Sequence, residues 1–211
     1  MFIRIKRIKG AEYAYLVKNV WSKSRDEARD KMIRAGVGNR TGGEGKVGAG
    51  RSVFERSKPK VRQKSLKYLG RVVRLNPKSE TSEPFEIMLA ESGIDINLLC
   101  SEEIIRLLIG HELLKLGFRK VRGVFCFEGV CVNLNKRQIR QKGRNVVLAL
   151  NNDFLCGFTL RRLLNFTFQG TGEEVGLEFA KAFVSAGIPV PEDVFVFLFS
   201  RIFREGGLSR L

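Results

Sequence analysis

A glycine-rich stretch at residues 36–50 constrains the fold more than any other feature of this 211-residue chain. The stretch holds seven glycines and no large apolar side chain, so it has nothing to pack into a core. Strand-like patterns stand on both sides of it. These are residues 2–8, a turn at Lys9-Gly10, a return strand at Glu12–Trp21 and a third strand at Val61–Leu75. The sequence predicts a basic three-stranded antiparallel sheet within residues 1–75, with a long flexible insertion at residues 36–60 and a short charged helix at Ser24–Ala35.

The second part of the chain has a different pattern. Residues 76–84 hold two prolines and are expected to link the sheet to a body at residues 85–211. Helices are expected at Pro84–Glu91 and Ser101–Leu116, the latter with Ser101 as N-cap and Gly117 after its end. Strands are expected at Lys120–Phe127, Val130–Leu134, Arg137–Gln141 and Asn145–Leu150, and final helices at Phe158–Phe166, Gly172–Ala186 and Pro191–Arg204. The predicted class is α+β.

Positive charge is concentrated at the N-terminal end of the chain. Residues 1–74 contain 21 Lys and Arg against 6 Asp and Glu, whereas the remainder contains 17 against 16. A field of that sign and density attracts a polyanion, and DNA and RNA are the commonest polyanion partners. A second basic segment, Lys115–Arg144, holds nine basic residues against one acid, and its end at Lys136–Arg144 is interpreted as a charged hairpin tip.

Aromatic residues accompany the basic ones, and a sheet face of this composition can lie across a groove or stack unpaired bases. The alternative is a sheet whose aromatics pack on the body while its charges only keep an edge soluble. The candidate nucleic-acid-binding residues are Arg4, Lys6, Arg7, Lys9, Tyr13, Tyr15, Lys58, Lys60, Arg62, Lys64, Lys67, Tyr68, Arg71, Arg119, Lys120, Arg122, Lys136, Arg137, Arg140, Lys142 and Arg144.

Two segments also carry a resemblance. The opening strand pair has Phe2, Arg4, Lys6, Tyr13, Tyr15, Leu16 and Val17, and the later segment has Arg62, Gln63, Lys64, Tyr68, Leu69, Gly70, Arg71 and Val72. Over about a third of the chain, this pattern resembles the N-terminal region of some insertion-sequence transposases and of small basic archaeal proteins. The resemblance implies contact with nucleic acid. It does not imply strand transfer, because the remaining residues offer no acidic triad.

Cysteine and histidine give little support for a metal or a cofactor. No cysteine pair has C-x-x-C spacing, and His111 is the single histidine. We interpret His111 as a structural helix residue and the four cysteines as small buried residues in a reducing cytosol. Cys126 and Cys131 face each other if Glu128-Gly129 is a two-residue turn. That pair could form a bridge, ligate a metal or remain as two thiols in contact, and the last is favoured.

The last helix contains an apolar run at Val194–Phe199, which is expected to pack in the core. The alternative is that one face of this helix stays uncovered and forms a homodimer interface. We expect a cytoplasmic protein without a membrane span, an N-terminal signal, a cofactor or catalytic residues. The predicted function is nucleic-acid binding through phosphate contacts, with DNA favoured over RNA. Alternatives are a structured-RNA or ribosome-associated factor, a nuclease and an adaptor that docks a protein through its helical body.

Overall fold

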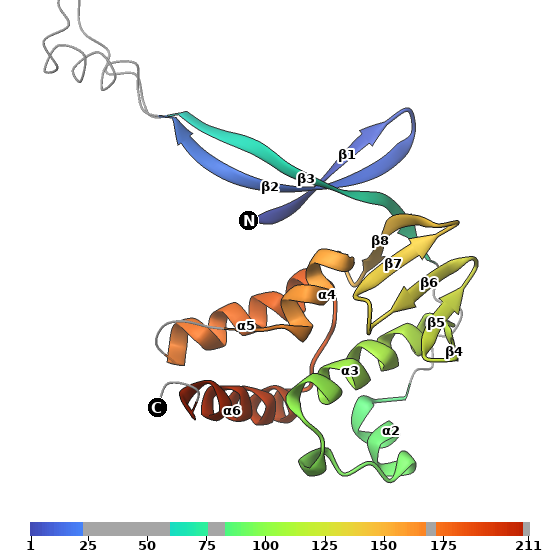
Figure 1. Cartoon of the computed structure of the whole chain (residues 1–211), viewed down its shortest axis with the longest axis vertical. Coiled ribbons are helices and arrows are strands. Elements are labelled where there is room, and N and C mark those ends of the chain that lie inside the picture. Colours follow the sequence, from blue (N-terminus) through green and yellow to red (C-terminus); the bar gives the residue numbers. More distant parts are fainter. Residues whose placement is uncertain (23–59, 76–82, 168–171, 209–211) are drawn as a thin grey trace, which may run out of the picture. The chain divides into compact units, whose positions relative to one another are not determined.

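The computed structural model describes residues 1–22, 60–75, 83–167 and 172–208, and it has both helices and strands, as the predicted α+β class requires (Figure 1). The strands of the described residues are β1 (Phe2–Ile8), β2 (Ala11–Ser22), β3 (Lys60–Arg74), β4 (Arg119–Val121), β5 (Val124–Phe127), β6 (Val130–Asn133), β7 (Gln138–Gln141), β8 (Arg144–Leu150) and β9 (Asp153–Leu155). The helices are α2 (Phe85–Ser92), the short 3₁₀ helix η1 (Ile96–Leu98), α3 (Ser101–Lys115), α4 (Gly157–Leu164), α5 (Gly172–Ala186) and α6 (Glu192–Leu208).

The strands form one sheet in the order β1-β2-β3-β8-β7-β6-β5-β4, with β9 paired to β8. The first three strands are neighbours, as predicted. They are not a separate sheet, however, because β3 continues into a parallel pairing with β8 from Arg71–Val146 to Arg74–Ala149. From β4 to β8 the chain is an antiparallel meander. The predicted insertion at 36–60 and the helix at Ser24–Ala35 lie outside the described residues, apart from Lys60 at the start of β3.

The chain divides into two compact units. One unit holds Phe2–Leu16 and Lys67–Leu211, and the other holds Met1 and Val17–Leu66. Of the second unit, the described residues after Met1 are the C-terminal part of β2 and the N-terminal part of β3. The predicted linker at 76–84 is described only at its last two residues, so the predicted domain boundaries stay a prediction.

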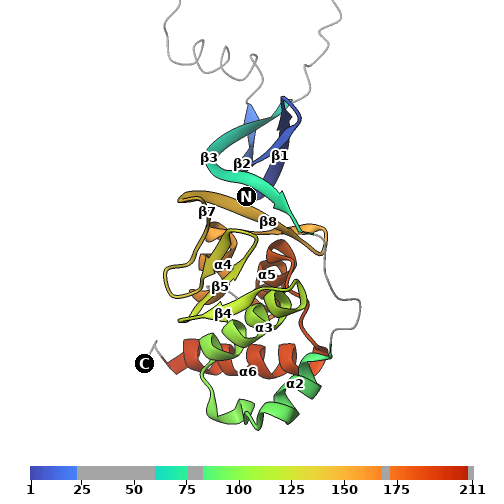
Figure 2. The same cartoon turned by 90° about the vertical axis from the view of Figure 1, so that its right-hand side faces the viewer.

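The main core of the larger unit lies between α3 to α6 and one face of the meander (Figure 2). On β5, β6 and β7, Phe125, Val132 and Ile139 are buried and alternate with more exposed residues, which is the period of a half-buried strand. On β8, Leu148 packs in this core and Val147 in a second one, so β8 is buried on both faces. This smaller core contains Ala14 of β2, Val72 of β3, Val147 of β8 and Cys156, the N-cap of α4. Strands β1 to β3 are therefore attached to the body by apolar packing as well as by the β3–β8 hydrogen bonds.

Tight turns join the strands of the meander. Glu128-Gly129 and Lys142-Gly143 have positive φ at both residues, as two-residue hairpin turns require, so both predicted turns are confirmed. The predicted strand Lys120–Phe127 is wrong. It contains a turn of the same kind at Arg122-Gly123, with φ values of 49° and 79°, and this turn divides it into β4 and β5.

The turn at Glu128-Gly129 places Cys126 opposite Cys131, with the two Cα atoms 4.3 Å apart, and the structure joins the pair in a disulfide. Both residues are half-buried, so the interpretation as two buried thiols is wrong. Cys156 is buried as expected, whereas Cys100 is exposed. Cys100, and not Ser101, is the N-cap of α3, because Glu103 reaches back to accept a hydrogen bond from its backbone nitrogen at 2.8 Å.

Helix α6 carries Phe195, Phe199 and Phe203 on the side that meets α5. Phe195 stacks on Phe179, and an added Cβ at Gly176 would lie 3.5 Å from the ring of Phe199. Val196 points elsewhere and is 57% exposed. The expected core role of this helix is confirmed, and the homodimer stays a prediction. Among the described helices, none is both long enough and apolar enough to cross a membrane.

Candidate nucleic-acid interface

Three tyrosines from β2 and β3 form a cluster in the larger unit. Tyr13 and Tyr15 flank the buried Ala14, so strand alternation places both rings on the face opposite to Ala14. The ring centroid of Tyr68 lies 5.4 Å from that of Tyr15 and 6.3 Å from that of Tyr13. Tyr68 is 53% exposed, whereas its two neighbours are half-buried. The accessible ring of Tyr68 therefore packs against the two half-buried rings of Tyr13 and Tyr15.

Burial raises the pKa of the Tyr68 phenol, and the nearby Tyr13 and Tyr15 raise it further, while Arg144 acts in the opposite direction. The phenol stays protonated at neutral pH, because the shift moves its pKa upward from an ordinary value of 10.0. Tyr68 therefore adds no negative charge to a basic surface. A neutral exposed ring of this kind is suited to stack on a nucleobase.

Basic side chains of β1 lie on the same side as the cluster. Ile3 and Ile5 pack against the smaller core, so Arg4 and Lys6 occupy the opposite face of the strand. The ammonium nitrogen of Lys6 lies 5.0 Å from the ring centroid of Tyr15, within cation–π range. The sequence prediction that Arg4 and Lys6 share a face is confirmed, and the structure adds the tyrosines to that face.

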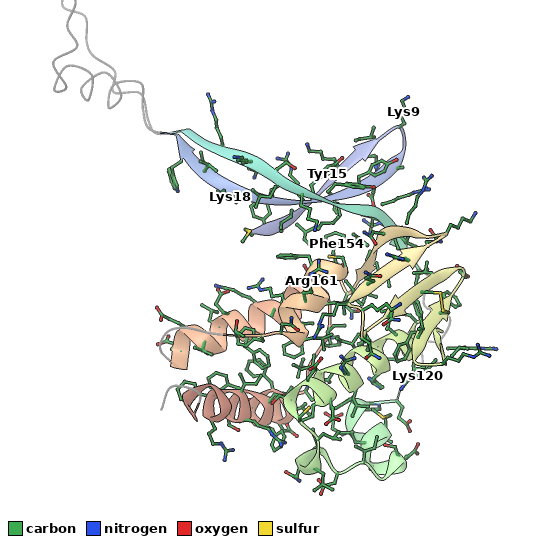
Figure 3. All side chains as sticks on the ribbon, in the orientation of Figure 1. Lys9, Tyr15, Lys18, Lys120, Phe154 and Arg161 are labelled. Carbon is green, nitrogen blue, oxygen red and sulfur yellow. A yellow bond between two sulfur atoms is a disulfide. The ribbon has the colours of Figure 1, made fainter. Side chains whose placement is uncertain are left out.

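Two other basic residues of this region are paired with an acid. Arg74 donates to Glu12 Oε2 at 2.9 Å, and Arg7 donates to Glu12 Oε1 at 3.3 Å. The hydrogen bond from Arg74 is the main reason that the pKa of Glu12 lies below its usual value. Lys9 lies at the turn between β1 and β2 (Figure 3), and Arg71 is exposed on β3 opposite Val146. Of these cations, Arg7 and Arg74 are therefore partly neutralised within the protein.

A cleft of about 150 Å³ opens beside Tyr68, between β3, β7, β8 and the start of α4. Its basic residues are Lys67 of β3, Arg140 of β7, Arg137 just before β7, and Arg161 of α4 (Figure 3). The lining also includes Tyr68 and Asn145 and contains no carboxylate. We call this feature the cationic cleft.

Three of the four cations of the cleft have no carboxylate partner within the part of the chain that the structure describes. These three are Lys67, Arg140 and Arg161. Arg137 lies 3.4 Å from Glu102, and its Nε is buried without an acceptor among the described residues. By contrast, Arg162 and Lys181 each lie within 3 Å of Glu178. The cleft thus concentrates positive charge that the described protein groups do not balance.

Gly70 sets the geometry of the cleft. Its φ is +143°, and an added Cβ would lie 2.6 Å from the carbonyl oxygen of Asn145. Only a residue without a side chain lets β3 approach β8 so closely at this point. The parallel pairing with β8 begins at the next residue, Arg71, so Lys67 and Tyr68 lie where β3 is not paired to β8. In the sequence, Gly70 stands out only as one position of a longer motif.

The second predicted basic segment is spread out by the fold. Lys136 and Arg137 connect β6 to β7, whereas Lys142 lies at the opposite end of β7, so Lys136–Arg144 is a whole strand with a turn at each end and not one hairpin tip. Arg140 is in register with Cys131 and Asn145, next to the cleft. Arg119, Lys120, Arg122 and Arg144 are exposed, and Lys120 lies 5.8 Å from the ring of Phe125.

The remaining predicted binding residues belong to the smaller unit or lie outside the described residues. Arg62 and Lys64 are exposed on the N-terminal part of β3, where Lys60 begins the strand. Lys58 lies outside the described residues. The structure therefore brings together Lys6, Tyr13, Tyr15 and Tyr68 in one cluster, and Lys67, Tyr68, Arg137 and Arg140 in one cleft.

Sequence reasoning missed Arg161 and Asn145. Asn145 is polar and uncharged, and Arg161 falls within residues 145–211, which as a whole have no excess of basic residues. The available signal was the pair Arg161-Arg162 on an amphipathic helix. Arg162 pairs with Glu178, whereas Arg161 has no carboxylate partner among the described residues. The two adjacent arginines therefore differ, because one forms an ion pair and the other lines the cleft.

No group of three or more His, Cys, Asp or Glu side chains among the described residues could hold a metal ion. His111 is buried, and its Nε2 lies 2.9 Å from the carbonyl oxygen of Glu83, so the interpretation as a structural helix residue is confirmed. A larger cavity of about 340 Å³ lies beside α3 and is lined mainly by apolar side chains. Its lining also includes His111, Arg106 and Lys120.

Comparison with protein-family models, with curated proteins and with solved structures finds no match to this chain.

Proposed function

We propose that this protein binds nucleic acid without acting on it chemically. The observation that carries the proposal is the shared face of β1, β2 and β3, where Arg4 and Lys6 lie beside Tyr13, Tyr15 and the exposed ring of Tyr68. Lysine and arginine attract phosphates, and exposed rings stack on bases. A formal net charge of +16 adds long-range attraction for a polyanion.

DNA is the favoured nucleic acid on the transposase-like pattern of β1 to β3, and structured RNA is the alternative. Phosphate contacts supply affinity with little sequence preference, because every nucleotide presents the same phosphate. A nuclease is a weaker candidate, since the described residues contain no group of three or more His, Cys, Asp or Glu side chains that could hold a metal ion. Competition by transfer RNA against duplex DNA separates the first two possibilities.

The test is fluorescence anisotropy of the full-length protein with labelled duplex DNA, single-stranded DNA and structured RNA over a salt series. The full chain is required because deletion of β3 would expose the edge of β8 and the smaller core. We expect the logarithm of the association constant to fall steeply and linearly with the logarithm of salt concentration. Weak binding of all three ligands at physiological salt would overturn the proposal.

A double substitution tests the surface itself. Lys6→Gln with Arg71→Gln removes two exposed cations from β1 and β3. We expect the slope of the salt dependence for duplex DNA to become shallower by about 0.9 for each phosphate that the variant no longer neutralises. Arg162→Gln with Lys181→Gln makes the same change in net charge where both cations already pair with Glu178. An equal effect of the two double variants would show that only net charge matters and that this face is not the site.

A further inference from the structure

The size and charge of the cationic cleft indicate which part of a nucleic acid it fits. Four cations from three separate parts of the chain line a cleft of about 150 Å³. Pockets that hold drug-sized ligands are larger, at roughly 300–1,000 Å³. The size and the charge together match one phosphate group better than a whole nucleotide.

The missing counter-charge points to a ligand. Like charges gathered in one cleft repel each other, so the arrangement costs free energy unless an anion is present. Some cations outside the cleft have such an anion within the protein, as Arg162 and Lys181 have Glu178. Others, such as Arg119 and Lys142, are exposed to solvent. Among the four cations of the cleft, only Arg137 has a carboxylate of the described residues nearby, that of Glu102 at 3.4 Å. Glu102 is shared, because it also pairs with Arg106 at 2.8 Å.

The position of Tyr68 indicates whether the site binds single-stranded or double-stranded nucleic acid. Tyr68 belongs both to the lining of the cleft and, through its ring, to the tyrosine cluster, so a nucleic acid with its phosphate in the cleft has a half-exposed tyrosine beside it. In a duplex, the faces of the bases are covered by their neighbours in the stack. A base within a single strand can turn its face toward a tyrosine, and such stacking is insensitive to sequence.

We propose that the cationic cleft binds a backbone phosphate of single-stranded nucleic acid while an adjacent base stacks on Tyr68. This inference rests on the proposed function and narrows it to one strand state and one subsite. Arg140, Arg161 and Lys67 provide the donors for the phosphate, and Tyr13 and Tyr15 hold the ring of Tyr68 in place. The cleft recognises the phosphate and the base face, which DNA and RNA share.

The experiment measures binding of the full-length protein to labelled oligothymidylate, to oligouridylate and to a DNA duplex of equal length. We expect Arg140→Gln with Arg161→Gln to weaken binding of the single strands roughly tenfold. The salt slope should become shallower by about 0.7 for each phosphate that is no longer neutralised. The control is Arg162→Gln with Lys181→Gln, which alters charge equally at residues outside the cleft. The two single-stranded probes show whether the sugar contributes.

A second pair of variants isolates the ring. Tyr68→Leu keeps an apolar side chain but removes the aromatic face, whereas Tyr68→Phe keeps the face. We expect Tyr68→Leu to weaken single-strand binding about 5- to 150-fold and Tyr68→Phe to leave it nearly unchanged. Photo-cross-linking with an oligonucleotide that carries 5-iodouracil should place the adduct on the peptide that contains Tyr68. This readout does not depend on any substitution.

The possible failures are distinguishable. If the cleft variant and the control variant weaken binding equally, or if Tyr68→Leu has no effect and the duplex binds as tightly as the single strand, the cleft is not the subsite. In both cases the broader proposal of nucleic-acid binding survives. If none of the probes binds at physiological salt, both proposals fail together.

Discussion

At the scale of single residues, Gly70 is a position where the backbone requires glycine. Two independent features exclude a side chain there, namely a φ of +143° and a contact distance of 2.6 Å from an added Cβ to the Asn145 carbonyl oxygen. We expect Gly70→Ala to lower the free energy of unfolding by about 3 kcal/mol, measured by urea denaturation, because conformational strain and a backbone clash act together.

Gly143 separates these two causes. It also has a positive φ, of +76°, but an added Cβ there meets nothing within 4 Å. Gly143→Ala should therefore cost only about 1–2 kcal/mol, the conformational part of the effect. An equal loss in the two variants would mean that the Cβ added by Gly70→Ala is accommodated without a measurable clash against Asn145.

At the scale of elements, the start of α3 depends on a charged cap. Glu103 accepts a hydrogen bond from the backbone nitrogen of Cys100, and this bond is the main reason that the pKa of Glu103 lies below 4.5. The carboxylate thus contributes to stability fully above pH 4.5, and the contribution is lost as the pH falls from there through the lowered pKa.

Glu103→Gln keeps an oxygen that can accept the same hydrogen bond but removes the titration. We expect the unfolding free energy of this variant to fall less steeply than that of the wild type as the pH drops below 4.5. Chemical denaturation at a series of pH values measures the difference. Parallel curves would show that the cap does not depend on the charge of Glu103.

The β5–β6 hairpin holds a second element-scale constraint, the disulfide between Cys126 and Cys131 across a separation of five residues. Replacement of both by alanine should lower the unfolding free energy by about 2 kcal/mol, the amount expected when so small a loop is released. A reducing agent should destabilise the wild type by a similar amount and leave the variant unchanged. If reduction has no effect on the wild type, the bridge does not contribute to stability.

The elements also show what the sequence could predict. Alternation in β1 and β2, and glycine turns at Gly129 and Gly143, are local signals, and the structure confirms them. The turn at Arg122-Gly123 was missed because apolar residues flank it on both sides and hide the break. The parallel β3–β8 pairing joins residues about 75 positions apart, and no local pattern reports such a contact.

The candidate site divides in the same way. Lys6, Tyr13, Tyr15 and Tyr68 were predicted because basic and aromatic residues gather within residues 1–75, where net charge is highest, whereas the face on which the tyrosines lie came only from the structure. The position of Arg161 in the cleft could not be predicted, because Arg161 meets Arg137 and Arg140 only when α4 is placed beside β7. Arg7 and Arg74 were both counted as free positive charge, and only the fold shows that Glu12 lies between them.

At the scale of the whole molecule, a net charge of +16 makes the stability of the protein depend on where each cation lies. Arg140 and Arg161 have no carboxylate partner among the described residues, so at low salt they add repulsion. Arg162 and Lys181 are attracted to Glu178, although these pairs are largely exposed, and exposed pairs contribute about 0.2–1 kcal/mol.

Two substitutions of equal charge should therefore change stability in opposite directions. At low salt we expect Arg140→Gln with Arg161→Gln to raise the melting temperature slightly, and Arg162→Gln with Lys181→Gln to lower it. Both differences should shrink with added salt, which screens repulsion and attraction alike. Differential scanning calorimetry at low and high salt measures them. If the cleft variant is instead destabilised at low salt, its cations already have a stabilising partner within the protein, and the cleft does not await an external anion.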